Sequence, residues 1–231
     1  MKTFPDKLFS SKDQGHKVKK FNQTLLSWGK ENFRDFPWRK ERTPYKVFIA
    51  EFLLKRTTST AAERNFVHII RHLPDLNSIV NTGIPAIEQL LRPVGLYKQR
   101  AKGLFEAANF VIKEYDGIFP RDYGLLNKIP HIGPYSASCI LSFGLDCAYP
   151  TVDSNVYRVL SRIFKDSFKN KATINRIFLF ADKIMPKRRH VQFNYGLLDF
   201  GALVCSYRGC SGPLCPMCDF CDTFRDERES H

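Results

Sequence analysis

The sequence predicts an all-α fold, and three observations support this. Apolar residues recur at helical spacing along nearly the whole chain. No run alternates between apolar and polar residues over the length of a strand. Glycine and proline divide the helical pattern into separate segments. With 231 residues, 43% of them hydrophobic, the chain is long enough to bury a proper core.

The predicted helices are separated by turns. Each helical segment shows either apolar residues at helical spacing or a helix-forming composition. Breaks are predicted at residues 82–85, 116–117 and 185–186, each of which contains glycine or proline. In order, the helices are expected over residues 21–33, 45–54, 58–72, 86–91, 98–115, 135–143, 155–164, 173–184 and 191–204.

The chain is basic, with 36 Lys and Arg residues against 23 Asp and Glu, and its net charge of +13 favours a polyanionic partner. Residues 1–16 are expected to form a flexible basic arm; a contact with a phosphate backbone and a plain solvated tail both fit it. This end lacks the apolar core of a secretory signal, and no stretch approaches the ~20 apolar residues of a membrane span.

A helix-breaking turn lies between two apolar helical stretches, in the sequence Ile-Pro-His-Ile-Gly-Pro at residues 129–134. Pro130 and Gly133 break the helix, and Pro134 suits the first turn of a new one. Backbone amides at such a helix N-terminus favour a phosphate. The turn alone is more typical of an ordinary helix-turn-helix corner, and the residues that follow it favour the phosphate site.

Asp153 stands at the start of a later amphipathic helix, in the run Val152-Asp153-Ser154-Asn155. This position suits an N-cap that satisfies free backbone amides. The same carboxylate is also available for chemistry. A phosphate-binding turn followed by a lone carboxylate therefore favours a protein that acts on DNA.

In these motifs the chain resembles the helix-hairpin-helix DNA glycosylases of the endonuclease III superfamily. Their hairpin, of Leu-Pro-Gly-Val-Gly type, is followed by a helix and a Val-Asp-x-Asn motif that carries the essential Asp, matched here by Asp153. The resemblance extends from about Trp28 to Cys221. Other matching segments lie at residues 35–39, 43–47, 51–58 and 94–101.

The resemblance implies two helical domains with the active cleft between them. One domain is expected to comprise residues 17–42 and 149–231, including a cysteine loop. The other is expected to comprise residues 43–148, including the helix-hairpin-helix.

Cysteines supply a second signal, because five of the seven lie within the last 27 residues, in a loop rich in Gly and Pro. Such clustering indicates metal or disulfide, and Cys139 and Cys147 in apolar helical context favour metal in an intracellular chain. Zinc and an iron–sulfur cluster both accept four thiolates, so the ligand type leaves both open. The five clustered cysteines are Cys205, Cys210, Cys215, Cys218 and Cys221.

The resemblance implies a [4Fe-4S] cluster at this place. The usual family pattern is C-x6-C-x2-C-x5-C, whereas this chain has Cys205-x9-Cys215-x2-Cys218-x2-Cys221. We expect these four cysteines as ligands, with Cys210 as the possible alternative. The cluster is expected to hold a basic loop near DNA and to order the C-terminus, and not to act in catalysis.

The implied reaction breaks the bond between sugar C1′ and a base. Positive charge develops on the sugar, so a carboxylate beneath the ring helps, and Asp153 fits this role by stabilising the oxocarbenium-like state, activating water, or both. The target base must leave the stack for a pocket. By resemblance, Leu96 is the candidate wedge, and Lys55 and Arg56 are candidates for contacts to the estranged partner. A core leucine and solvated basic residues are the alternatives.

Position 135 selects the reaction subtype. Lyase members of the superfamily carry a lysine there that forms a Schiff base with the sugar. This chain has Tyr135, so it is expected to leave an abasic site without efficient strand cleavage. Lys128 precedes the turn and is not expected to substitute. His131 replaces the usual hairpin glycine, and histidine tolerates a left-handed backbone better than most residues.

Further residues of the hairpin and of the Asp153 motif are expected at the DNA. These residues are Lys128, His131, Ile132, Gly133, Tyr135 and Asn155.

The identity of the target base is predicted from residues around Glu51. Thymine mismatch glycosylases of the Mig type and adenine mismatch glycosylases of the MutY type both have a tyrosine that matches Tyr135 and a glutamate that matches Glu51. Apolar neighbours predict that Glu51 faces a cleft. The run Leu-Lys-Arg-Thr-Thr at residues 54–58 resembles the thymine type, since adenine enzymes usually have glutamines after the leucine. Adenine enzymes also generally carry an additional C-terminal domain after the cysteine loop.

We therefore expect a monofunctional glycosylase for thymine or uracil opposite guanine. The alternative is a MutY-type enzyme acting on A:G or A:8-oxoguanine. A bifunctional lyase would need a lysine in place of Tyr135, and a catalytically silent DNA-binding module would lack Asp153. The expected partner is double-stranded DNA with a mismatched or damaged base, bound by a monomer inside a prokaryotic cell, in the cytoplasm or nucleoid, without a membrane.

Overall fold

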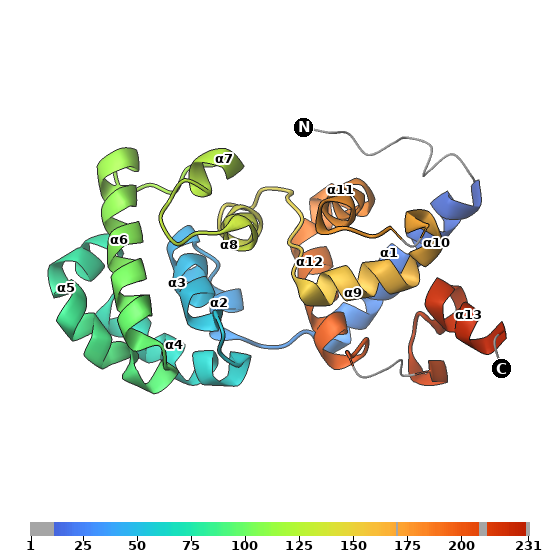
Figure 1. The fold of residues 1–231 in the computed structure, drawn as a ribbon, viewed down its shortest axis with the longest axis horizontal. Helices are drawn as coiled ribbons and strands as arrows, with labels where there is room; N and C mark the ends of the chain where they lie inside the picture. The colour runs from blue at the N-terminus through green and yellow to red at the C-terminus, as the bar shows by residue number, and fades with distance from the viewer. Residues whose placement is uncertain (1–11, 170, 208–211, 230–231) are drawn as a thin grey trace. The chain divides into compact units, whose positions relative to one another are not determined.

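The computed structural model describes residues 12–169, 171–207 and 212–229, and these residues form helices and connecting segments without a strand (Figure 1). The predicted all-α fold is thereby confirmed. The described chain divides into two compact units. Unit 1 comprises Met1–Arg34 and Ala148–His231, and unit 2 comprises Asp35–Cys147.

Residues 35–42, which the sequence grouped with the first helix, lie in unit 2. The reason is aromatic packing around the short helix α2 (Pro37–Lys40). Trp38 is buried, stacks on Phe36 at a centroid distance of 4.7 Å, and meets the edge of Phe66 at 5.4 Å.

Unit 2 is built around helix α3 (Pro44–Leu54), whose residues 47–53 are all buried. Thr43 caps it, since Thr43 Oγ1 accepts a hydrogen bond from the Lys46 amide at 3.1 Å. Against α3 pack α4 (Ser59–His72), α6 (Tyr97–Tyr115) and α8 (Pro134–Cys139) with its π-helical continuation Ile140–Gly144. Gly144 permits the π-helical segment to approach the start of α3 closely, because a Cβ there would lie 2.7 Å from the Pro44 Cα.

The remaining elements of unit 2 are α5 (Leu76–Leu91), the 3-10 turn η2 (Arg92–Val94) and α7 (Tyr123–Leu126). Helix α5 lies along α6 (Figure 1). The predicted break at residues 82–85 is a kink inside α5, where Gly83 has φ 73°. The helix nevertheless starts at Leu76 instead of residue 86, because Asp75 and Ser78 form a capping box that the apolar pattern did not reveal.

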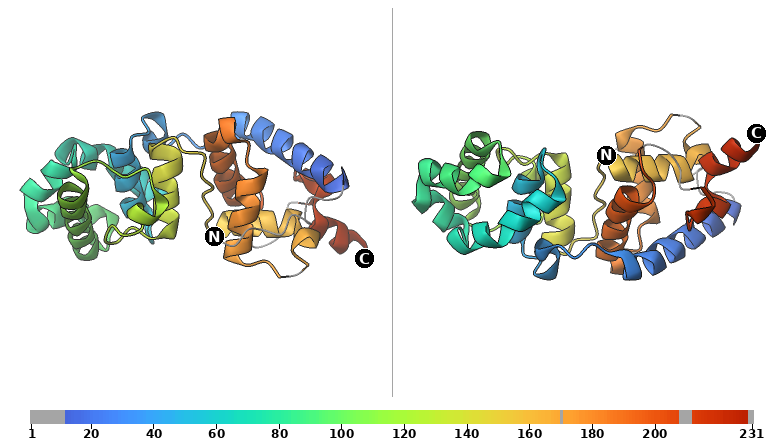
Figure 2. Two further views of the ribbon diagram at one scale, coloured as in Figure 1. Left: turned by 90° about the horizontal axis from the view of Figure 1, so that it is seen from above. Right: turned by 90° about the horizontal axis from the view of Figure 1, so that it is seen from below.

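Unit 1 is centred on α12 (His190–Leu203), which is buried along most of its length. Helix α1 (Lys12–Asn32) lies along α12, and α12 packs on α9 (Ser154–Ile163) (Figure 2). Phenylalanines fill the core: Phe164 lies 5.1 Å from Phe21 and 4.8 Å from Phe180 between ring centroids. The described part of α1 begins at Lys12, so residues 12–16 of the expected arm are helical, while residues 1–11 lie outside the described residues.

The other elements of unit 1 are short, apart from one helix of eleven residues. They are α10 (Lys165–Phe168), α11 (Ile174–Ile184), α13 (Asp222–Glu229) and the 3-10 turns Lys187–Arg189, Gly212–Leu214 and Cys218–Phe220.

Buried ion pairs hold the two ends of unit 1. Asp199 is fully buried on α12 and accepts hydrogen bonds from the Arg34 amide at 3.0 Å and from Arg34 Nε at 2.5 Å. Asp222 at the start of α13 is buried and pairs with Lys17 of α1. Within the described residues, none of the helices combines the length and apolar character that a membrane crossing requires.

Candidate active site

The predicted hairpin is present in unit 2 as α7, a turn and α8. Asp122 caps α7 by accepting a hydrogen bond from the Leu125 amide at 2.8 Å. Ile129 and Ile132 anchor the turn in the core, with 1% and 4% of their surface exposed. Gly133 then adopts an extended backbone as the N-cap of α8, and open space surrounds the position where a Cβ would stand. The open space beside Gly133 leaves room for another molecule at the N-terminus of α8.

His131 shapes the turn with its backbone and its side chain. Its φ of 63° is left-handed, where the related hairpins have glycine. His131 Nε2 lies 2.5 Å from Glu106 Oε2 on α6, and this hydrogen bond lowers the pKa of Glu106. The His131 carbonyl accepts a hydrogen bond from Lys55 Nζ at 2.5 Å. The hairpin is thus fastened to both α6 and the end of α3.

Glu51 lies inside unit 2, next to α8. Only 9% of its surface is exposed, and its Oε2 accepts a hydrogen bond of 3.1 Å from the hydroxyl of Ser136, which is also buried. Tyr135 precedes Ser136 and is half-buried. The structure therefore brings Glu51 close to the start of α8, next to residue 135; the predicted cleft at Glu51 stays a prediction. Lys128 is exposed and lies before the turn.

Arg56 and Leu96 occupy the loops that follow α3 and precede α6. Both have left-handed backbones, with φ 51° and 49°, and both side chains are exposed. Leu96 exposes 44% of its surface, which excludes the alternative of a core leucine. Lys55 lies between Arg56 and α3, with its ammonium 4.3 Å over the Phe52 ring and bonded to the hairpin.

Asp153 caps helix α9 in unit 1. Its Oδ1 accepts a hydrogen bond from the Val156 amide at 2.8 Å, and its Oδ2 accepts one from Asn155 Nδ2 at 2.9 Å. The residue is half-buried. A carboxylate has about four lone-pair sites, so it can still accept a further proton or hydrogen bond.

Buried Asn194 of α12 fixes the extended segment that leads to Asp153. Its Oδ1 accepts a hydrogen bond from the Thr151 amide at 3.2 Å, and its Nδ2 donates to the Tyr149 carbonyl at 2.8 Å. The sequence did not predict this role, because the two partners of Asn194 lie more than forty residues away and form no local motif with it.

Arg158 connects the Asp153 motif to the end of α12. Its Nη2 donates to Asn155 Oδ1 at 2.8 Å and to the Gly201 carbonyl at 2.6 Å, and its Nε donates to the Cys205 carbonyl at 2.8 Å. Gly201 allows this approach, since a Cβ there would lie 2.7 Å from the Asn155 Cβ. Asp153 is therefore linked through two side chains to the start of the cysteine loop.

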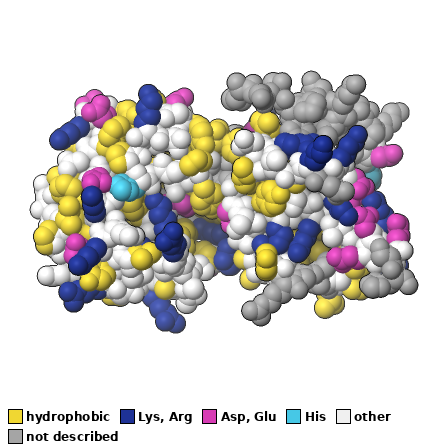
Figure 3. All heavy atoms as spheres, in the orientation of Figure 1, with side chains coloured by type: hydrophobic (Ala, Val, Ile, Leu, Met, Phe, Trp, Pro, Cys, Tyr) yellow, Lys and Arg dark blue, Asp and Glu magenta, His cyan; other side chains and the backbone are white. Residues whose placement is uncertain are grey.

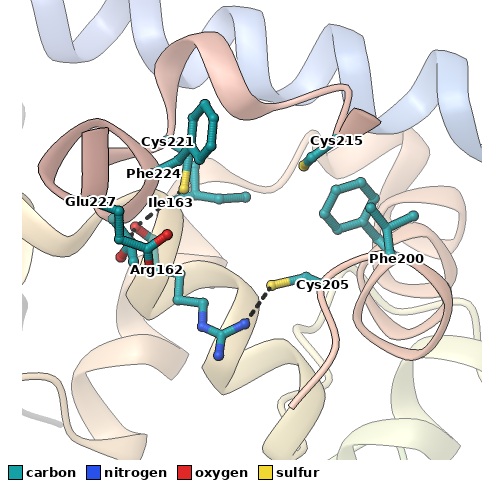
Figure 4. A pocket seen from close by; sticks show the side chains of 10 residues that line it. Arg162, Ile163, Phe200, Cys205, Cys215, Cys221, Phe224 and Glu227 are labelled. Atoms are coloured by element: carbon teal, nitrogen blue, oxygen red, sulfur yellow. Dashed lines mark hydrogen bonds between the residues drawn. The ribbon is translucent and has the colours of Figure 1, made fainter. Parts of the chain in front are cut away.

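Three of the expected ligands, Cys205, Cys215 and Cys221, line one pocket of about 60 Å³. Figure 4 shows their sulfur atoms directed toward the same space. Arg162 lies beside them: its Nη1 is 3.5 Å from Cys205 Sγ, and its carbonyl is 3.7 Å from Cys221 Sγ. Cys218 does not line the pocket; its Sγ lies 3.5 Å from Asp219 Oδ1. Cys210 lies outside the described residues.

These three cysteines fit a metal centre that is bound through thiolates. Three thiols share one pocket, and the Arg162 guanidinium beside Cys205 suits the negative charge that thiolate ligands bring. In the described part of the chain, no three His, Cys, Asp or Glu side chains are arranged for a single metal ion.

Lysine and arginine side chains are spread over the visible face of each unit (Figure 3). Together with the net charge of +13, this surface suits a polyanion.

Comparison with known proteins gave consistent matches. The family model of the HhH-GPD superfamily base excision DNA repair protein matches residues 49–179. The chain is 31% identical over 210 residues to an adenine DNA glycosylase of Buchnera aphidicola subsp. Schizaphis graminum, covering 90% of this chain and 60% of that protein. It is 31% identical to a thymine/uracil-DNA glycosylase of Methanothermobacter thermautotrophicus, covering 90% of this chain and 95% of the other.

A solved structure of a thermostable thymine-DNA glycosylase superposes with a TM-score of 0.88 at 30% identity. It covers 92% of this chain and 99% of that one.

Gly201→Ala is expected to lower the free energy of unfolding by about 1–3 kcal/mol, because the new methyl group overlaps Asn155 and must displace the start of α9. Urea denaturation measures this loss. Gly15→Ala is the matched control: Gly15 lies on α1 with nothing within 4 Å of a Cβ, so its replacement should be neutral or stabilise by up to about 1 kcal/mol. Equal stability of the two variants would contradict the close approach of α12 to Asn155.

Proposed function

The chain belongs to the HhH-GPD superfamily of base excision DNA repair proteins, and on this premise we propose that it is a monofunctional mismatch DNA glycosylase that releases thymine or uracil opposite guanine. The observation that carries the glycosylase reaction is the buried carboxylate of Glu51, which bonds Ser136 next to Tyr135 at the start of α8. The choice of thymine or uracil rests on residues 54–58, which resemble the thymine type. The similarity to a thymine-DNA glycosylase over nearly the whole chain supports it.

In this proposal Asp153 supports the departure of the base. Its two hydrogen bonds fix the orientation of the carboxylate. A fixed anion stabilises the positive charge that develops on the sugar without reorganising during the reaction. The same carboxylate can accept the proton of the water that attacks C1′.

Glu51 is proposed to recognise the flipped base. The Ser136 hydroxyl holds one carboxylate oxygen and so restricts the orientation of the group. An ionised carboxylate in that position accepts a hydrogen bond from the N3–H edge of thymine or uracil. In the alternative, a MutY-type adenine enzyme, a protonated Glu51 would instead donate to the purine; the similarity to the Buchnera adenine DNA glycosylase keeps this alternative under test.

Tyr135 accounts for the proposed absence of lyase chemistry. A phenol cannot form a Schiff base with the sugar, which a lysine amine at this position would do. Lys55 is bonded to the hairpin carbonyl and lies over Phe52, so it is engaged in holding the turn. The reaction is therefore proposed to stop at the abasic site.

Duplex binding is proposed to rest on the hairpin and on exposed side chains. The first amides of α8, with Ile132 and Gly133 in the turn, suit a phosphate, and the net charge of +13 adds sequence-independent affinity. Leu96 is proposed as the wedge and Arg56 as the contact to the estranged base, because both side chains are exposed.

Superfamily members of the endonuclease III and MutY type commonly bind a [4Fe-4S] cluster. We propose Cys205, Cys215, Cys218 and Cys221 as its ligands here, with Cys210 as the alternative to Cys218. When bound, the cluster supplies a four-thiolate cross-link that orders the loop. Arg158 bonds the Cys205 carbonyl and Asn155, so an ordered loop also helps to hold the Asp153 motif.

Single-turnover base release tests the proposed substrate. Labelled duplexes hold G:T, G:U, A:G, A:8-oxoguanine or thymine glycol, and each reaction is developed with and without alkali. We expect strand breaks only after alkali and only from G:T and G:U. Breaks in the adenine strand would transfer the assignment to the adenine type, and breaks without alkali would contradict the role given to Tyr135.

Single serine substitutions of the five clustered cysteines test the ligand set. Iron and sulfide content and visible absorbance are measured on the purified full-length proteins. Cys205→Ser, Cys215→Ser, Cys218→Ser and Cys221→Ser are expected to lose the cluster, while Cys210→Ser keeps it. A full cluster in Cys218→Ser together with its loss in Cys210→Ser would exchange these two residues in the ligand set.

A further inference from the structure

Arg100 is a buried arginine without an acidic partner. It lies in the first turn of α6 with 4% of its surface exposed, and this burial lowers its pKa. Lys and Arg are rarely buried unless they are paired. In the described part of the chain no carboxylate pairs with this guanidinium, so its contacts must explain its position.

Those contacts join two loops that are about forty residues apart in sequence. We define the first loop as residues 55–58, after α3, and the second loop as residues 92–96, before α6. Arg100 Nη1 donates to the Val94 carbonyl of the second loop at 3.2 Å. Arg100 Nη2 donates to the Lys55 carbonyl and to Thr57 Oγ1 of the first loop.

The two loops also touch each other at this point. The Thr57 hydroxyl lies 3.4 Å from the Val94 carbonyl, and it lies 2.5 Å from Arg100 Nη2. One planar guanidinium therefore contacts a carbonyl of each loop and the hydroxyl that bridges them.

Both loops carry unusual backbone next to these contacts. Arg56 has φ 51° between the two bonded residues of the first loop, and Leu96 has φ 49° in the second, after Gly95 with φ 76°. A left-handed backbone at a residue other than glycine costs free energy and persists only where its surroundings enforce it. The hydrogen bonds from Arg100 lie directly beside these residues and supply that constraint.

The two residues with left-handed backbones have exposed side chains. Leu96 exposes 44% of its surface, and Arg56 is also exposed. These are the two residues to which the proposed function assigns the wedge and the contact to the estranged base.

We infer that Arg100 is a positioning residue that locks the two loops together, so that Leu96 and Arg56 enter the duplex as one rigid unit. This inference rests on the proposed function, because it concerns how the base is flipped. A wedge must hold its position against stacked bases while one of them is extruded. A loop with no anchor would yield, and the base would return to the stack.

The guanidinium is suited to this task in a way that an ammonium is not. Its fixed planar fork donates to both loops at once, whereas lysine presents a single point charge on a flexible chain. Arg100→Lys therefore keeps the charge and removes the simultaneous contacts. Arg71→Lys is the matched control, since Arg71 is exposed in the last turn of α4, at the opposite end of that helix from the first loop.

The experiment uses the full-length protein and three readouts. A 2-aminopurine next to a G:U mismatch reports unstacking, single-turnover kinetics report uracil release, and titration with an undamaged duplex reports backbone binding. Arg100→Lys is expected to lower the unstacking amplitude and the release rate about tenfold, while affinity for the undamaged duplex changes less than about twofold. Arg71→Lys should match the unchanged protein in all three.

A double-mutant comparison with Leu96→Ala separates positioning from a general loss of structure. If Arg100 acts through the wedge, Arg100→Lys adds little to the defect of Leu96→Ala, because the two changes disable one device. The inference would be overturned if the rate losses of Arg100→Lys and Leu96→Ala multiplied in the double variant. It would also be overturned if Arg100→Lys released uracil more slowly while unstacking the base normally. Thr57→Val removes the bridging hydroxyl and gives a milder form of the same test if Arg100→Lys does not fold.

The outcome for the unchanged protein distinguishes the two proposals. If it releases no base from any duplex, the proposed function fails, and the inference fails with it. If it releases uracil and Arg100→Lys does so equally well, only the inference is overturned.

Discussion

The hydrogen bond from the Val156 amide to Asp153 Oδ1 determines at once where α9 begins and where the proposed catalytic carboxylate lies. The first amides of a helix have no partner within the helix, and a capping side chain satisfies one of them. The rest of unit 1 supports this bond. Asn194 fixes the backbone before Asp153, and Arg158 fixes Asn155, which holds the second carboxylate oxygen. Gly201 lets α12 pack closely against Asn155 at the start of α9, which these contacts require.

Unit 2 shows the same arrangement, in which a buried polar side chain supports a residue with a proposed function. Ser136 bonds the carboxylate of Glu51, and Arg100 bonds carbonyls in the two loops that carry Arg56 and Leu96. Each buried polar group loses its hydration, and this cost is offset only when its hydrogen bonds are made within the protein. A substitution that removes one hydrogen bond of such a side chain therefore changes the position of the residue that it supports. This makes these side chains suitable for mutational tests of function.

Local chemistry made part of this arrangement predictable. Pro130, Gly133 and Pro134 placed the hairpin correctly, because these residues restrict the backbone wherever they occur. The apolar neighbours of Glu51 predicted a residue facing a cleft, and the structure shows Glu51 to be buried. Helices α2, α7 and α10 were missed, since four residues are too few to show a helical period.

Contacts between distant residues could not be predicted from the sequence. Helix α13 is strongly polar and is held by buried Asp222, whose partner Lys17 lies at the other end of the chain. Arg100 looked like one more basic residue of a basic helix until its partners in two loops were known. Cysteine spacing likewise did not reveal that Cys218 lies off the pocket that Cys205, Cys215 and Cys221 line.

The most direct test of the role of Asp153 is single-turnover base release by Asp153→Asn, measured together with duplex affinity. Asparagine still caps a helix, so the fold is kept while the charge is removed. Asp122→Asn, at the cap of α7, controls for the loss of a capping charge elsewhere. The account predicts that Asp153→Asn loses base release at least about a hundredfold and binds the duplex within about twofold of the unchanged protein. Unimpaired release by that variant would contradict it.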